Sequence, residues 1–151
     1  MRYLSIFIFA LIISCNGQKK AAMKDKNEMN QDSEKLIMIL QDNYSGSDIE
    51  ETVIIKDAKT LKSFYSKINR TRKPGLAVPE VDFTKEMILI HCIGEQKNGR
   101  QAALSIMEEN DLELVIRTSV QKLQKKGPSS SITSPFCVYK MPLTQKEIIF
   151  K

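Results

Sequence analysis

Hydrophobic residues are spread unevenly along the chain, and their spacing divides it into three parts. The first part is an apolar run from Tyr3 to Ile13 that is interrupted by Ser5. The second part, residues 16–33, is almost wholly polar and shows no periodicity. From residue 34 onward, short apolar runs alternate with turn-forming residues, which is typical of a folded domain rich in strands.

One segment of the domain has the periodicity of a helix. Asp57 is a favoured helix N-cap residue, and the apolar residues after it recur at i, i+3, i+4 and i+7. These residues, which share one helical face, are Leu61, Phe64, Tyr65 and Ile68. We therefore expect a helix from about Ala58 to Asn69, followed by a turn at Lys73-Pro74-Gly75.

The other apolar runs predict strands. In chain order they cover 36–40, 52–55, 87–93, 102–107, 112–117, 136–140 and 148–150. The run 87–93 is almost unbroken, which indicates a strand covered on both faces. The runs 102–107 and 112–117 alternate in polarity around a polar turn, which indicates a hairpin. The expected fold class is α+β, a mostly antiparallel β-sheet of six or seven strands with one amphipathic helix.

The first apolar run has the length of an export signal. Eleven helical residues span about 16 Å, whereas a bilayer core is about 30 Å thick. We therefore expect residues 1–14 to be a signal peptide and not a membrane span.

The end of this run, Ile12-Ile13-Ser14-Cys15, resembles the lipobox of bacterial lipoproteins. The resemblance implies that Cys15 is linked to diacylglycerol and becomes the mature N-terminus. The alternative is ordinary signal cleavage that leaves a free thiol. Residues 15–33 would then be a lipidated tether, and the stretch after Cys15 is similar to lipoproteins of the Bacteroidota. We expect a cell-envelope location, anchored to the outer membrane on its periplasmic face.

Length, charge and histidine content narrow the function classes. The chain has 151 residues, enough for one domain, which we place at 34–151. Lys and Arg total 23 against 18 Asp and Glu, for a formal charge of +5. The basic run at Lys122, Lys125 and Lys126 lacks interleaved aromatic residues, so we expect no nucleic-acid partner. A single His excludes a His-based metal cage.

Several blocks resemble the C-terminal domain of the PrcB family, named for a lipoprotein subunit of a spirochaete protease complex. The resemblance covers about residues 50–150. Its blocks are Val81-Asp82-Phe83, the strand that ends at Gly94, Asn98-Gly99, Ser134-Pro135-Phe136 and Lys140-Met141-Pro142. Where family members often carry Gly-Gly-Tyr, this chain has Gly99-Arg100-Gln101. The family implies a non-catalytic lipoprotein that supports assembly or stability of an envelope protein partner, in the founding case a protease.

Three residues of the domain could carry thiol chemistry. His91 and Cys92 are neighbours in a predicted strand, so they point to opposite faces. His91 could instead meet Cys137, but no residue marks the orienting group that a nucleophilic thiol needs. We expect Cys92 to be a buried apolar packing residue and His91 to be half-buried. Cys92 and Cys137 could form a disulfide or remain two buried thiols.

The acidic turn residues offer oxygen ligands without the spacing of a metal loop. Asp42, Asn43 and Asp48 lack the glycine of an EF-hand, and Asp82 is expected to cap a turn. We therefore expect no metal, no cofactor and no catalytic residue. The alternative function is a periplasmic small-ligand or metal-binding module, which would require a concave apolar pocket. A hydrolase would require His91 within reach of Cys137.

Overall fold

The computed structural model describes residues 35–97, 99–122 and 131–151. The expected signal peptide and tether, including Cys15, lie outside these ranges. Asn98, Lys125 and Lys126 also lie outside them.

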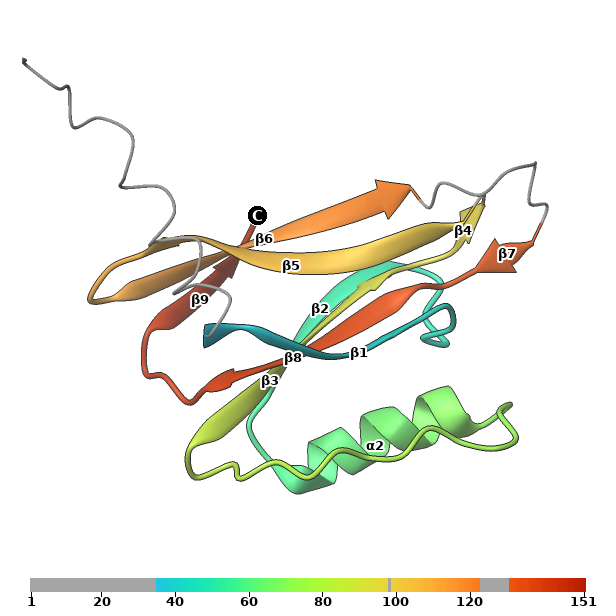
Figure 1. Ribbon diagram of the computed structural model, residues 1–151, viewed down its shortest axis with the longest axis horizontal. Coiled ribbons are helices and arrows are strands. Elements are labelled where there is room, and N and C mark those ends of the chain that lie inside the picture. Colours follow the sequence, from blue (N-terminus) through green and yellow to red (C-terminus); the bar gives the residue numbers. More distant parts are fainter. Residues whose placement is uncertain (1–34, 98, 123–130) are drawn as a thin grey trace, which may run out of the picture.

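The described residues contain one helix and nine strands (Figure 1). They are β1 (Ile37–Asp42), β2 (Glu50–Ile55), α2 (Ala58–Asn69), β3 (Glu86–Ile93), β4 (Gln96–Lys97), β5 (Arg100–Glu109), β6 (Glu113–Lys122), β7 (Ile132–Thr133), β8 (Phe136–Pro142) and β9 (Glu147–Phe150). Within these ranges, no helix has the length and hydrophobicity needed to cross a membrane.

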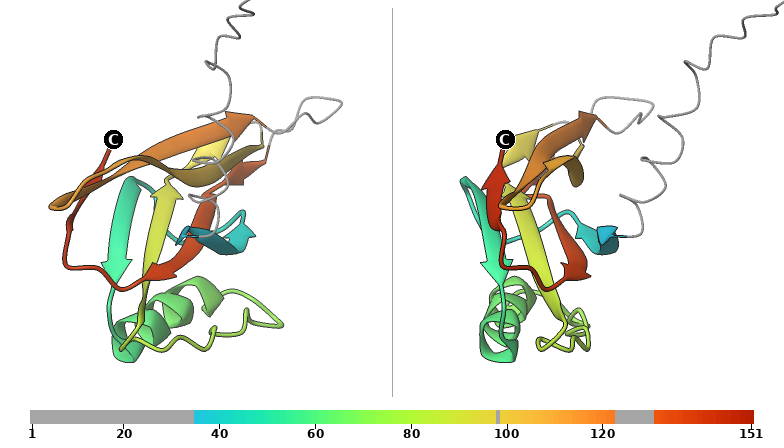
Figure 2. Two further views of the ribbon diagram at one scale, coloured as in Figure 1. Left: turned by 60° about the vertical axis from the view of Figure 1, so that its left-hand side comes forward. Right: turned by 90° about the vertical axis from the view of Figure 1, so that its left-hand side faces the viewer.

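The strands form three sheets. The largest has the order β1-β8-β3-β2 and is antiparallel throughout. The second, β5-β6-β9, joins an antiparallel hairpin to the parallel strand β9. The third pairs the short strands β4 and β7. α2 covers one face of the four-stranded sheet, and the β5-β6-β9 sheet lies on the other side (Figures 1 and 2). The predicted α+β class, mostly antiparallel, is confirmed.

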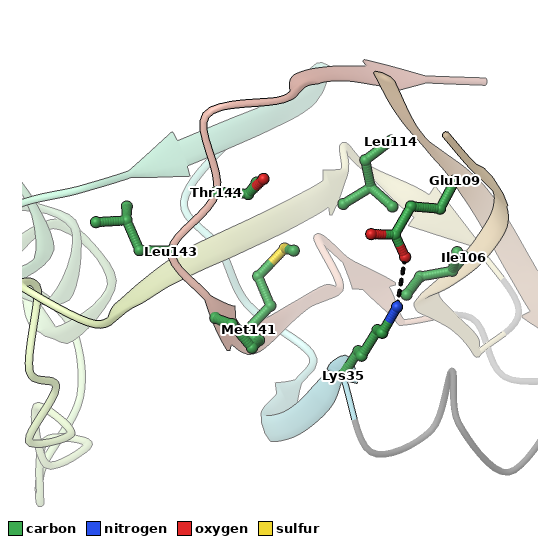
Figure 3. Close-up of a pocket in the computed structure, with 8 residues that line it drawn as sticks. Lys35, Ile106, Glu109, Leu114, Met141, Leu143 and Thr144 are labelled. Atoms are coloured by element: carbon green, nitrogen blue, oxygen red, sulfur yellow. Dashed lines mark hydrogen bonds and ion pairs between the residues drawn. The ribbon is translucent and has the colours of Figure 1, made fainter. Parts of the chain in front are cut away.

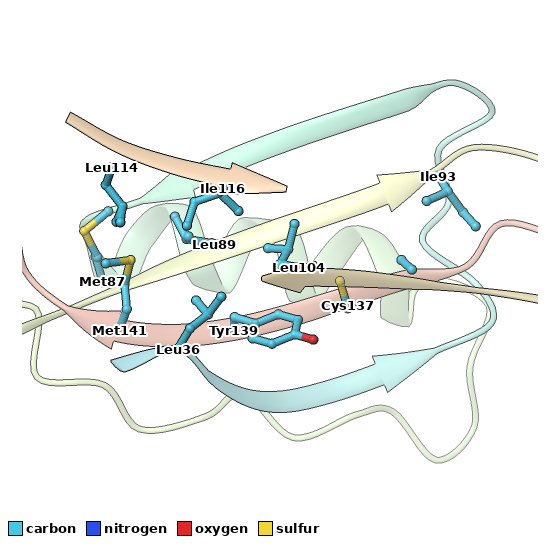
Figure 4. Packing of buried hydrophobic residues seen from close by; sticks show 11 residues of the cluster. Leu36, Met87, Leu89, Ile93, Leu104, Leu114, Ile116, Cys137, Tyr139 and Met141 are labelled. Carbon is cyan, nitrogen blue, oxygen red and sulfur yellow. The ribbon is translucent and has the colours of Figure 1, made fainter. Parts of the chain in front are cut away.

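The two faces of β3 belong to two different hydrophobic clusters. One face packs between the two larger sheets through Met87, Leu89 and Ile93 (Figure 4). The other face packs beneath α2 through Ile88, Ile90 and Cys92. This explains the unbroken apolar run, because a strand with both faces covered needs apolar residues at every position.

The helix has the bounds that the sequence predicts. Asp57 has extended backbone geometry, and its carboxylate accepts a hydrogen bond from the Thr60 backbone N–H at 2.8 Å. This bond satisfies one of the free amides of the first turn and lowers the pKa of Asp57. Leu61, Tyr65 and Ile68 are buried against the sheet.

The seven longer strands match the seven predicted runs, and the structure adds details that periodicity does not show. β4 and β7 have two residues each. The β5-β6 register shifts between Ile106 and Glu108, which interrupts the predicted alternation near the hairpin turn.

Gly94 ends β3 at a point where two backbones approach closely. Its φ is +68°, and a Cβ at this position would lie 2.8 Å from the Asp48 carbonyl oxygen and 2.8 Å from the Ile49 carbonyl carbon. The nearby Glu95 N–H donates to the same Asp48 oxygen at 3.1 Å. A side chain at position 94 would therefore displace the loop that leads into β2.

We predict that Gly94→Ala lowers the free energy of unfolding by about 3 kcal/mol or more, because it combines backbone strain with a clash. Gly46→Ala is the matched control. Gly46 has a similar φ of +67°, but its nearest contact to an added Cβ is 3.8 Å. That variant should cost about 1–2 kcal/mol, from strain alone. Urea unfolding of both variants checks the prediction, and equal losses would contradict it.

Candidate functional site

His91 and Cys137 are direct neighbours across the β3–β8 pair. The Cys137 thiol donates a weak hydrogen bond to the His91 carbonyl oxygen at 3.8 Å. Both residues are fully buried. Cys92 packs in the cluster beneath α2. The prediction that His91 and Cys92 point to opposite faces is confirmed, and the register places His91 opposite Cys137, which the sequence left open.

The surroundings of this pair favour its neutral forms. Burial raises the pKa of Cys137 to about 12 and the pKa of Cys92 to about 11. Burial also lowers the pKa of His91, which the carboxylate of Glu50 only partly opposes. A thiolate next to an imidazolium is therefore disfavoured here, and neither group is open to a substrate.

His91 is more buried than the sequence predicts. It was expected to be half-buried, but its side chain is 0% exposed because β3 is a central strand with both faces covered. Among the described residues neither Nδ1 nor Nε2 makes a hydrogen bond of ordinary geometry, and the nearby Glu51 backbone acts against the lowering of the His91 pKa. The Oε1 atom of Glu50 lies 3.8 Å from Nε2.

The disulfide that the sequence left open is not formed. Cys92 and Cys137 are both free and buried. The register pairs Cys92 with Phe136, so the two thiols lie on adjacent pairs of the ladder and point to opposite faces. Cys137 belongs to the cluster between the sheets, and Cys92 to the cluster beneath α2.

The acidic turn residues have structural partners. The Asp82 carboxylate accepts from the Thr84 N–H at 3.1 Å and from the Thr84 hydroxyl, which lowers the pKa of Asp82. Asp42 forms a two-point ion pair with Arg72. Within the described ranges, no cluster of His, Cys, Asp and Glu side chains has the arrangement of a metal site.

Some of the positions that the family resemblance pointed to hold the loop before β2 in place. Ser134 is buried, and its backbone carbonyl accepts from the Ser45 N–H at 2.7 Å. The Pro135 carbonyl accepts from the Ile93 N–H at 3.0 Å. Phe136 packs edge-on against Phe64 of α2. Together with Gly94, these residues have a structural role at one end of the β3–β8 pair.

Gly99 stands apart from that group. It lies directly before β5 and has a φ of +58°, a conformation that favours glycine.

A second group gathers at the opposite end of the same pair. Pro142 ends β8 opposite Glu86, and the Leu143 N–H donates to the Lys85 carbonyl at 2.7 Å. Val81 and Phe83 are partly buried and pack against the cluster beneath α2. The blocks at 81–86 and 140–142, far apart in sequence, therefore meet at one place.

Two hollows flank this end of β8, and we call the residues that line them the β8-end surface. The first, about 180 Å³, is lined by Lys35, Ile106, Glu109, Leu114, Met141, Pro142, Leu143 and Thr144. The second, about 280 Å³, is lined by Ile37, Lys85, Glu86, Lys140, Met141 and Pro142. Figure 3 shows the ion pair of Lys35 and Glu109 beside the apolar side chains of Ile106 and Met141.

Paired charges line the rim of both hollows. Glu109 binds Lys146 at 2.6 Å and Lys35 at 2.7 Å, and these two cations hold the pKa of its carboxyl below the usual value. Lys140 binds Glu86 at 2.7 Å and lowers the pKa of Glu86 in the same way. The rim therefore presents charged groups around an apolar floor.

Apolar side chains are exposed on the edge strand beside the hollows. β1 is one of the two edge strands of the four-stranded sheet, and β2 is the other. The β1 residues Ile37 and Met38 are 47% and 49% exposed. An edge strand with free backbone groups and exposed apolar side chains can accept a further strand.

Comparison of the chain with protein family models, curated protein sequences and solved structures finds no significant match. The assignment of a site therefore depends on the geometry. Sequence reasoning singled out Pro142 and its neighbours through the family resemblance, but it did not bring Lys35, Glu109 and Lys146 together. These three come from distant segments, and no local pattern connects them.

We predict that acidification destabilises the domain through His91. The unfolded chain binds a proton on this His near pH 6.5, whereas burial lowers the folded-state pKa. Its contribution to stability is therefore complete above about pH 6.5 and is lost as the pH falls towards the folded-state pKa. Urea unfolding between about pH 7.5 and 5.5 should show this loss, and His91→Leu should remove it.

The pH range from about 7.5 to 5.5 reports on His91, because it is the sole His of the chain. The carboxylates with lowered pKa values, such as Glu109, lose their contribution only below about pH 4.5. Equal pH dependence in the wild type and in His91→Leu would contradict the prediction.

Proposed function

We propose that this protein is an exported, lipid-anchored, non-catalytic component of a bacterial envelope that supports the assembly or stability of a protein partner. The signal-like first run and the lipobox at Cys15 support the anchoring. The resemblance to the PrcB family over residues 50–150 supports the role, and it makes a protease the first partner class to test.

The β8-end surface is the observation that carries the proposal. It combines an edge strand, half-exposed apolar side chains and two hollows in one place. An extended partner segment could pair with the outer edge of β1 and place alternate side chains in the hollows. Rim charges such as Lys140 and Glu86 would then set the register of the partner.

The size of the hollows favours a protein partner over a small ligand. Sites for small molecules usually enclose about 300–1,000 Å³ and bury most of the ligand. The two hollows hold about 180 Å³ and 280 Å³. Each therefore suits one or two anchoring side chains of a larger partner better than a whole ligand.

The first prediction of this proposal concerns the anchor. In cells given a labelled fatty acid, the wild-type chain should take up label and sediment with membranes. Cys15→Ser should lose the label, because the hydroxyl does not replace the thiolate nucleophile. Cys92→Ala should keep the label, because Cys92 is buried in the domain. Label that persists in Cys15→Ser would contradict lipidation at this residue.

The second prediction concerns the partner. Affinity capture of the lipidated protein after cross-linking in its own envelope should recover one dominant protein. Ile37→Glu should reduce that recovery about tenfold or more, because it puts a charge where an apolar anchor is expected. The matched control is Ile132→Glu, which changes an exposed isoleucine of β7 at the far end of the molecule (Figure 1).

The outcome separates three cases. Loss with Ile37→Glu and not with Ile132→Glu supports the β8-end surface. Equal loss with both variants contradicts that surface. Failure to enrich any partner, under conditions that recover known envelope complexes, contradicts the assembly role.

A further inference from the structure

The outward face of α2 is a row of cations and hydroxyls. Because Leu61, Tyr65 and Ile68 turn towards the sheet, the opposite face points to solvent. The residues of that face are Lys59, Lys62, Ser63, Ser66 and Arg70, all exposed. They follow a spacing of i, i+3, i+4, i+7 and i+11, which makes a stripe about 16 Å long. We call this stripe the basic face.

Charge is concentrated in this part of the chain. Residues 56–73 hold seven of the 23 Lys and Arg residues and one of the 18 Asp and Glu residues. Lys56 and Lys73, both exposed, flank the basic face at its two ends. The single acid of the stretch, Asp57, is engaged as the helix N-cap.

The Lys and Arg side chains of this region differ in whether a carboxylate pairs with them. Lys67 and Arg72 are neutralised by acids of the four-stranded sheet, Lys67 by Glu51 at 3.4 Å and Arg72 by Asp42. In the part of the chain that the structure describes, Lys59, Lys62 and Arg70 have no carboxylate within 4 Å. The N-cap carboxylate of Asp57 attracts Lys59 at longer range, and all three cations are exposed to an external anion.

The hydroxyls lie between the cations. A shallow hollow on α2 is lined by Lys59, Lys62, Ser63 and Ser66. Ammonium and hydroxyl groups are both donors to phosphate oxygens. The combination fits phosphate groups at a surface, and it lacks the acidic side chains that would repel them.

We propose that the basic face of α2 docks on an anionic phospholipid surface. The choice of a membrane rests on the lipid anchoring proposed above, because a tethered domain meets its own membrane at high effective concentration. Residues 16–33 separate Cys15 from the domain, and a random-coil linker of 18 residues spans about 24 Å. The contact is electrostatic and not inserted, since the apolar side of α2 is already buried in the domain.

Two features favour lipid over other polyanions. Single-stranded nucleic acid is bound by exposed aromatic residues, whereas Phe64 and Tyr65 of α2 pack inward. Lysines provide mobile point charges instead of a fixed fork, which suits headgroups that have no fixed geometry. An acidic protein surface remains an outcome of the test.

The test uses residues 16–151 without lipid, which include every residue that the structure describes. Sedimentation with phosphatidylcholine vesicles is compared with vesicles that contain about one third phosphatidylglycerol. Binding to the anionic vesicles should be at least about tenfold stronger and should fall at high salt. Lys59→Glu with Lys62→Glu should lower it about tenfold or more, and the two Gln substitutions should lower it less.

The matched control is Lys97→Glu with Lys122→Glu, which makes the same change in net charge on strands β4 and β6, away from α2 (Figure 1). Retained binding in this control supports the proposal. Equal loss in both pairs, no preference for anionic vesicles, or tighter binding of polyglutamate than of these vesicles would overturn it. The vesicle experiment uses a chain that carries no lipid and no partner. A negative vesicle result therefore does not contradict the anchoring and partner predictions. Failure of those two predictions likewise does not change the measured vesicle binding.

Discussion

Burial of both faces of the β3–β8 pair is the constraint on which the other elements depend. The register from Glu86 with Pro142 to Cys92 with Phe136 assigns each buried apolar side chain of these strands to one of the two clusters. A pair that is apolar on both faces needs a cover on each side. α2 supplies one cover, and the β5-β6-β9 sheet supplies the other (Figure 2). The two surfaces that we propose therefore lie outside these packed layers, at the end of β8 and on the outward face of α2.

This constraint also explains why the most reactive side chains have structural roles. His91, Cys92 and Cys137 lie on the central strands, where burial keeps the thiols and the imidazole neutral. The charged groups that solvent reaches lie elsewhere. Some of them form the rim around Met141 and Pro142, and others form the stripe along α2, so the two surfaces are built from different elements. The partner surface and the membrane surface that we propose therefore share no residue.

The elements with strong local signals could be predicted from the sequence. The helix at 58–69 follows from Asp57 and a single apolar face, and β3 follows from its unbroken apolar run. Features that depend on pairing could not be predicted in this way. The bulge at Ile106, the parallel position of β9 and the full burial of His91 result from contacts between distant segments. The network of Glu109 with Lys35 and Lys146 is of the same kind, so the sequence indicated Pro142 but not the surface around it.

Cys92 and Cys137 point to opposite faces of the same sheet, and this has a consequence for how the protein matures. A disulfide needs Cα atoms within about 7 Å and Cβ vectors that point towards each other, and thiols on opposite faces of one sheet fail the second condition. The native fold of the domain therefore requires no thiol oxidant. With Cys92 and Cys137 held apart in this way, the domain reaches the same structure in oxidising and reducing surroundings.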